Sequence, residues 1–294
     1  MDIFAFLGLP LPTGVSIGAL FLISIAAGAI GAMLGIGGGL VLVPVLVVLF
    51  GVDIHFAIAT SLVSVIATST GAASTEVEAG YTNVRLGVFL ETATSTGALL
   101  GALVAVTVLA SRGDVLVWAF VPVVVGAGGY MLVQRGRVTD DAPPPDRLAR
   151  RLSLVGECPD LERGGRRRYA ATNTSAGLLV AGLAGVASGL LGVGGGLFKV
   201  PAMNSLMRIP FRVAGATSTF MIGVTAAASA LVYLFAGDVV LLLTVPTAFG
   251  TLAGSRAGAG LRAGTSATML RRLFAVALFA SAATMALEAA GVIS

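Results

Sequence analysis

Long apolar stretches separated by short polar intervals make up most of this chain. They fall into two groups of five, one on each side of a polar interval at 134–169. In each group one stretch has only about half of the roughly 20 residues that a membrane-spanning helix needs. The pattern predicts an all-α polytopic membrane protein. The stretches cover residues 14–34, 40–50, 54–75, 85–110, 115–133, 173–191, 197–207, 213–235, 239–258 and 268–290.

The polar interval is the one marked change of composition along the chain. It holds nine Arg, six acidic residues and the run Pro143-Pro144-Pro145. We expect a solvated linker there. The predicted organisation is a first transmembrane repeat at 1–134, a cytoplasmic polar linker at 135–170 and a second transmembrane repeat at 171–294.

The two halves share a glycine-rich motif in constant register. Leu34-Gly-Ile-Gly-Gly-Gly-Leu-Val-Leu-Val-Pro44 reappears 157 residues later as Leu191-Gly-Val-Gly-Gly-Gly-Leu-Phe-Lys-Val-Pro201. The same offset aligns Ala59-Thr60-Ser61 with Ala216-Thr217-Ser218, without a gap. An internal duplication explains this register better than chance similarity between apolar sequences does.

The motif is incompatible with an uninterrupted helix. Each Gly costs a helix about 1 kcal/mol relative to Ala, and Pro costs about 3 kcal/mol. Backbone groups freed at membrane depth are tolerated only where protein or a wet cavity satisfies them. Paired breaks in corresponding halves therefore predict the binding site of a transporter.

Composition supports a membrane protein and argues against several other classes. Hydrophobic residues make up 56% of the chain and charged residues 11%, whereas a soluble domain has about 25% charged residues. The net charge of +4 comes from short polar stretches, so we expect no nucleic-acid partner. A single Cys and a single His argue against a disulfide, a metal site or a cofactor. The N-terminal apolar stretch lacks a basic leader, and we expect it to remain as a membrane segment.

Arginine positions suggest an orientation, since short cytoplasmic loops carry an excess of Lys and Arg. If each half has five segments, both termini lie outside and the halves are inverted relative to each other. The alternative has four crossing segments per half, re-entrant glycine-rich pieces and parallel repeats. The inverted arrangement places these on the cytoplasmic side: Arg85, Arg208, Arg212, Arg262, Arg271 and Arg272.

Two halves that each carry G-x-G-G-G-x-x-x-x-P, with a Thr-Ser pair sixteen residues after the Pro, resemble the TauE/SafE-type sulfite exporter family. The resemblance covers nearly all of the chain outside the central interval. It implies secondary transport of a small sulfur-containing anion, such as sulfite or an organosulfonate, usually outward.

The predicted substrate-binding residues come from the breaks and from the hydroxyl pairs. Backbone N–H groups at a helix start, and the positive end of the helix dipole, suit an anion. Thr and Ser hydroxyls can donate to an anion, or can bond to their own backbone. The glycines Gly97, Gly101, Gly254 and Gly258 suit helix packing better. The predicted substrate ligands are Gly37, Gly38, Gly39, Thr60, Ser61, Gly194, Gly195, Gly196, Lys199, Thr217 and Ser218.

Charged residues inside apolar stretches are functional candidates, because a charge at membrane depth is costly. Lys199 follows the second glycine triplet, and its repeat partner is Leu42. It either attracts substrate or extends to an interface. Glu91 either carries a coupling proton or pairs with a buried cation, and Arg256 is either a charge in the pathway or an interfacial anchor.

Two other function classes fit less well. A passive anion channel needs weak sites along a lined pore, whereas the breaks here form one related pair. An intramembrane serine hydrolase would need a base beside Ser188, and His55 is predicted at an outer edge. We therefore expect a proton-coupled or otherwise gradient-driven transporter with no enzymatic activity, and a channel is the alternative.

Overall fold

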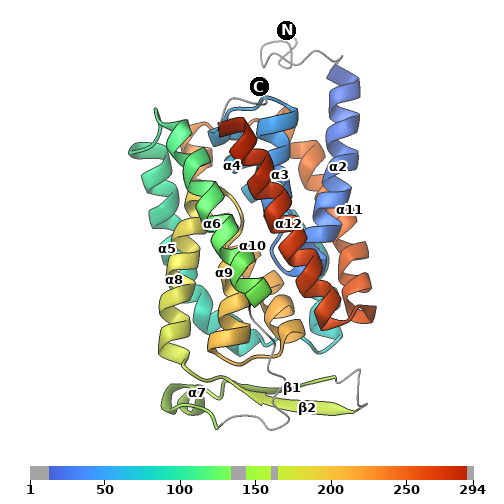
Figure 1. Ribbon diagram of the computed structural model, residues 1–294, viewed down its shortest axis with the longest axis vertical. Helices are drawn as coiled ribbons and strands as arrows, with labels where there is room; N and C mark the ends of the chain where they lie inside the picture. The colour runs from blue at the N-terminus through green and yellow to red at the C-terminus, as the bar shows by residue number, and fades with distance from the viewer. Residues whose placement is uncertain (1–12, 134–143, 160–164, 290–294) are drawn as a thin grey trace.

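The computed structural model describes residues 13–133, 144–159 and 165–289. Within these ranges each apolar region folds into five helical segments at the predicted places (Figure 1). The first region contains α2 (Thr13–Leu34), α3 (Gly39–Pro44), α4 (Ile54–Glu78), α5 (Val84–Thr107) and α6 (Gly113–Val133). The second contains α8 (Thr174–Leu191), α9 (Gly196–Pro201), α10 (Phe211–Ala236), α11 (Leu241–Gly264) and α12 (Ala267–Ala289).

Five of the described helices are long and apolar enough to cross a membrane, namely α2, α4, α5, α8 and α10. The helices α6, α11 and α12 reach 21, 24 and 23 residues. In α11 the apolar stretch is interrupted by Arg256 and Arg262. The predicted all-α polytopic membrane fold is confirmed.

Each glycine motif breaks the chain between a long helix and a short one. Gly35 and Gly37 adopt φ of +77° and +70°, and Gly194 and Gly195 adopt +74° and +75°. Side chains are strained at such values, so glycine is needed there. Beyond each break the short helix runs into a π-helical turn, Val45–Leu49 or Ala202–Leu206, directly after a Pro. Pro has no N–H to donate, which favours the wider turn.

The broken segments are half-length, as predicted. The apolar helix Gly39–Leu49 has 11 residues. In Figure 1 the chain reverses at the first break, so α3 runs back toward the end of the bundle where α2 begins. That end also holds the last turns of α12, whereas α8 begins at the opposite end, directly after the hairpin strand β2 (Arg166–Ala170). In this view α2 and α8 run in opposite directions, and the inverted relation of the two halves stays a prediction.

Helices of one half pack against helices of the other in matching pairs. The helix α2 lies against α11, and its repeat equivalent α8 lies against α5. Likewise α4 packs against α10, and α6 against α12. A Cβ on Gly97 or Gly101 would overlap backbone carbonyls of α8, and one on Gly254 or Gly258 would overlap those of α2. The packing role predicted for these four glycines is confirmed.

The polar interval has structure that the sequence analysis did not predict. It contains the short helix α7 (Arg147–Arg151) and an antiparallel hairpin of β1 (Val155–Pro159) and β2. In Figure 1 this unit covers the end of the bundle opposite the start of α2. Strand preference was hidden because the hairpin is rich in Arg, and its pairing is stabilised by the exposed contact of Arg168 with Glu157 at 2.7 Å.

Two side chains join this unit to the bundle. Asp146 caps α7 through the Ala149 N–H at 2.7 Å and also accepts from the N–H and hydroxyl of Thr174 at the start of α8. Burial raises the pKa of the Asp146 carboxyl, but these hydrogen bonds outweigh burial and hold the pKa below its ordinary value. The Tyr169 hydroxyl accepts from the Asn83 amide at 3.2 Å, and burial raises the pKa of Tyr169 to about 12.

Candidate functional site

The two glycine breaks meet at the interface between the halves, and each is held by a serine of the other half. The Ser61 hydroxyl donates to the Gly192 carbonyl at 2.7 Å, and the Ser218 hydroxyl donates to the Gly35 carbonyl at 2.7 Å. These two bonds are equivalent under the 157-residue offset, because Ser61 aligns with Ser218 and Gly35 with Gly192. The buried carbonyls at the breaks thus have donors, as buried backbone groups require.

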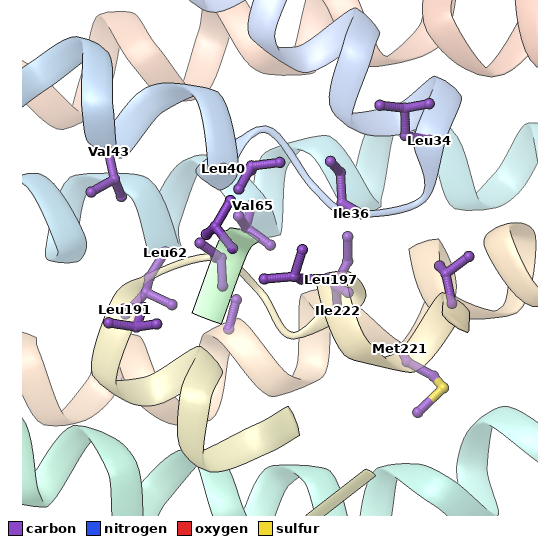
Figure 2. Packing of buried hydrophobic residues seen from close by; sticks show 14 of the residues in the cluster. Leu34, Ile36, Leu40, Val43, Leu62, Val65, Leu191, Leu197, Met221 and Ile222 are labelled. Atoms are coloured by element: carbon purple, nitrogen blue, oxygen red, sulfur yellow. The ribbon is translucent and has the colours of Figure 1, made fainter. Parts of the chain in front are cut away.

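The glycine triplets are closely packed in this conformation. A Cβ on Gly37 would lie 2.9 Å from side-chain atoms of Val65 and Ile222, and one on Gly194 would lie 2.8 Å from Val65. A Cβ on Gly39 or Gly196 would lie still closer to the opposite break, against the Gly192 carbonyl oxygen or the Gly35 carbonyl oxygen. Figure 2 shows Ile36, Val65, Leu197 and Ile222 between the two break loops. Access of a ligand to the triplets would require these side chains to move apart.

The predicted threonine ligands also join helices. Thr60 lies 3.4 Å from the Thr244 hydroxyl on α11, and Thr217 accepts a hydrogen bond from the Asn83 backbone N–H at 3.0 Å. Both hydroxyls are buried. A substrate role for them stays a prediction.

The structure brings together Lys199 and Glu91, which the sequence analysis treated separately. Lys199 Nζ lies 3.5 Å from Glu91 Oε2, with the side chains 0% and 12% exposed. Lys199 also donates to the Thr225 hydroxyl at 2.6 Å, and that hydroxyl donates to Glu91 Oε1 at 2.7 Å. The Ser95 hydroxyl donates to the same carboxylate oxygen at 2.6 Å. Glu91 belongs to the first half and Lys199 to the second, so this ion pair joins the halves.

This charged cluster adjoins the second break. A Cβ on Gly195 would lie 3.2 Å from Lys199 Cε and 3.4 Å from Ser188 Cβ. The Ser188 hydroxyl is buried and has no hydrogen-bond partner among the described residues, and Glu91 Oε2 has no hydrogen bond beyond its ion-pair contact with Lys199 Nζ at 3.5 Å. Unsatisfied buried polar atoms are rare in native structures and often mark a site that a ligand or water completes.

No equivalent cluster is formed at the matching positions around the first break. There Leu42 replaces Lys199 and Ala248 replaces Glu91. Thr68, which aligns with Thr225, donates to its own helix at the Ser64 carbonyl, 2.9 Å away. Ser95, Thr225 and Ser188 were missed as site residues. Ser95 lies one helical turn after Glu91, and this spacing could have identified Ser95 as a partner of the carboxylate.

Arg256 lies apart from these groups. Its side chain is exposed on α11, whereas Lys199 and Glu91 lie inside the bundle. His55 is also engaged elsewhere, since its ring nitrogens lie 3.1 Å from Asp53 Oδ1 and 3.2 Å from the Leu109 carbonyl. Its ring is thus not directed at the Ser188 hydroxyl.

A second buried ion pair lies nearer the hairpin end. Arg262 Nη1 contacts Glu76 Oε1, and the two residues are 4% and 3% exposed. Arg262 Nε donates to the Met33 carbonyl near the end of α2 at 2.7 Å. The sequence analysis used Arg262 only as a marker of orientation. The offset of 157 residues relates Arg262 to Ala105 and Glu76 to Tyr233. Each charged residue of this pair thus has an uncharged repeat partner, as Lys199 has.

These features define a polytopic membrane protein built from two related halves that meet at paired helix breaks around a buried charge. The sequence matches the family described as Sulfite exporter TauE/SafE over residues 20–285, and the chain belongs to that family. It is 27% identical over 249 residues to the probable membrane transporter protein YunE of Bacillus subtilis (strain 168), which covers 82% of this chain and 87% of the relative. No solved structure gives a significant match. The protein is a membrane transporter.

Proposed function

We propose that the protein is a secondary transporter that moves a small sulfur-containing anion, such as sulfite or an organosulfonate, across the cell membrane by alternating access. The name of the family supports the substrate class and the outward direction. The observation that carries the proposal is the burial of one cation, Lys199, beside the second glycine break.

An anion is the natural ligand for this lysine. A buried ammonium group needs a counter-charge, because an unpaired charge at membrane depth is costly. In this conformation the carboxylate of Glu91 provides it. Sulfite and sulfonates present oxygens of the same kind, so in the proposed cycle the substrate replaces Glu91 as the partner of Lys199. The Ser188 hydroxyl and the N–H groups at Gly194–Gly196 provide further donors.

This replacement would link anion binding to proton binding. If Glu91 left Lys199 while still ionised, it would become an unpaired buried carboxylate. Protonation of Glu91 therefore accompanies binding of the anion, and one proton moves with each anion in the same direction. An inward proton gradient then favours uptake, and export requires an outward gradient of the anion that outweighs the inward gradient of the proton that leaves with it.

In this proposal the two halves move relative to each other at the glycine breaks. The serine bonds and the apolar residues between the triplets close the interface in this conformation. Rocking of the halves would separate them and expose Gly37–Gly39, Gly194–Gly196 and the neighbouring hydroxyls to the pathway. Arg256, which is exposed on α11, is not part of the proposed site.

Thermal unfolding of the purified protein with added anions tests the substrate class and the role of Lys199. A ligand that binds only the folded state raises stability, by about 2.7 kcal/mol at 100 times its Kd. We expect sulfite, thiosulfate or sulfoacetate to raise the melting temperature of the parent protein at lower concentrations than simple carboxylates do.

The matched variant combines Lys199→Met with Glu91→Gln. It removes both charges, so no unpaired buried charge remains to disturb folding. Half-maximal stabilisation should need at least about tenfold more anion, since charge-assisted hydrogen bonds contribute about 1.5–3 kcal/mol. Stabilisation by carboxylates alone would refute the substrate class, and an unchanged response of the double variant would refute the site.

A further inference from the structure

A small pocket lies at the hairpin end of the bundle, apart from Lys199. It is formed by the last turns of α4, the first turns of α10 and the C-terminal part of α11, and its volume is about 30 Å³. A single water needs about 10–15 Å³ on this measure, so the pocket has room for two or three water-sized groups. Among its lining residues are Thr75, Glu76, Tyr81, Arg212, Ala216 and Arg262.

Two of the side chains that line the pocket carry buried polar atoms that lack hydrogen-bond partners among the described residues. Arg262 contacts Glu76 through Nη1, but its Nη2 is buried without a hydrogen-bond partner among the described residues. Glu76 Oε2 is in the same state. Leaving a buried charged donor unsatisfied costs more than leaving a neutral one. The lined space beside Arg262 is therefore suited to a ligand that supplies acceptor oxygens.

The net charge of the side chains that line the pocket decides whether the pocket suits an anion or a cation. Two arginines, Arg212 and Arg262, line the pocket together with one carboxylate residue, Glu76. Arg212 is half-buried, lies 6.0 Å from the centre of the Tyr81 ring and donates to the Thr265 carbonyl. Arg presents a planar set of donors that fits oxyanions. The excess positive charge excludes a cation and favours an oxyanion.

The opposite end of the bundle lacks the elements of such a pocket. At the positions related by 157 residues, Arg262 corresponds to Ala105, Glu76 to Tyr233 and Arg212 to His55. Tyr233 donates to the Gly189 carbonyl at 2.9 Å, and His55 pairs with Asp53. The charged lining is thus a property of the hairpin end and not of the repeat itself.

The pocket also adjoins the first glycine break. A Cβ on Gly35 would lie 2.8 Å from Arg262 Nη2, so the guanidinium lies directly against the break. We propose that the pocket is a second anion-binding site, which takes the head group of a small oxyanion at the hairpin end before it reaches Lys199. This inference rests on the proposed function for the identity of the anion, but the pocket's chemistry alone argues for an oxyanion.

Binding of radiolabelled sulfite to the Lys199→Met/Glu91→Gln protein isolates this site, since the central site is disabled there. Equilibrium dialysis should show residual binding. Adding Arg212→Gln should weaken it at least about tenfold, because a charge-assisted contact is lost. Adding Glu76→Gln should strengthen it, because a like charge is removed from the pocket. Arg208→Gln, a change at an exposed position near the same end, is the matched control and should leave binding unchanged.

The outcomes separate this proposal from the proposed function. Absent residual binding, or residual binding that does not depend on Arg212, would show that the pocket holds only water. Sulfite binding that is equal in the parent and in the double variant, and that is lost with Arg212→Gln, would support the pocket and refute Lys199 as the central site.

Discussion

At the scale of residues, positions that hold the same residue in both repeats (symmetric positions) have a different role from positions that hold different residues (asymmetric positions). The symmetric ones, such as Ser61 and Ser218, hold the backbone of the breaks together. The asymmetric ones carry the charges, since Lys199 aligns with Leu42 and Arg262 with Ala105. We therefore expect binding of substrate and protons at positions where the two repeats differ. Positions where they agree are expected to stabilise the backbone of the breaks.

The serine bonds give a residue-scale prediction. Ser61→Ala and Ser218→Ala should each lower the free energy of unfolding by about 1–3 kcal/mol, because each leaves a buried carbonyl without a donor. The two losses should be similar, since the bonds are equivalent. Melting temperatures in detergent measure the effect.

Thr70→Val is the matched control for these two variants. The Thr70 hydroxyl is exposed and bonds within its own helix, to the Ile66 carbonyl at 2.8 Å. If Ser61→Ala and Ser218→Ala melt at the temperature of this control, the serine bonds do not stabilise the breaks.

At the scale of elements, the halves are joined by close approach of long helices. The glycines of α5 and α11 bring these helices against the backbones of α8 and α2. In lipid there is little hydrophobic force between helices, so such packing is an important source of association. The short helices α3 and α9 are held in turn by the long helices around them.

Single methyl groups test this packing. Gly101→Ala and Gly258→Ala each place a Cβ on a carbonyl oxygen of the facing helix, so both should destabilise the protein, by roughly the 1–3 kcal/mol typical of overpacking. Gly18→Ala on α2 meets nothing within 4 Å and should be neutral or stabilising. Thermal unfolding in detergent compares the three variants. Equal melting temperatures would show that these helices tolerate a wider separation.

At the scale of the whole molecule, the start of α2 and the end of α12 lie at one end of the bundle and the hairpin at the other (Figure 1). The two buried ion pairs lie at different positions along the bundle. The Lys199–Glu91 pair lies within the bundle beside the second break, and the Glu76–Arg262 pair lies toward the hairpin end. An anion that enters from the hairpin end would thus meet the second pair before the first.

The helices and breaks were predictable because they rest on local properties. Apolar length predicts the helices, and three Gly followed by a Pro predict each break. The contact between Lys199 on α9 and Glu91 on α5 was not predictable, because it depends on how α10 packs against both helices and so brings residues 108 positions apart together. The hairpin was missed because its strands are short, β1 contains a Gly and a Pro, and β2 begins with three Arg, so their pairing has no clear hydrophobic alternation.

The central claim is that substrate and Glu91 compete for Lys199, with a proton taken up by Glu91. Uptake of labelled sulfite into proteoliposomes, with the outside more acidic than the inside, tests it most directly. The parent protein should accumulate sulfite above the outside concentration. Glu91→Gln should lose this accumulation but keep exchange of labelled for unlabelled sulfite, since exchange needs the conformational cycle without net proton movement. Accumulation by Glu91→Gln equal to that of the parent would contradict the claim, and equilibration without accumulation by the parent would indicate a channel.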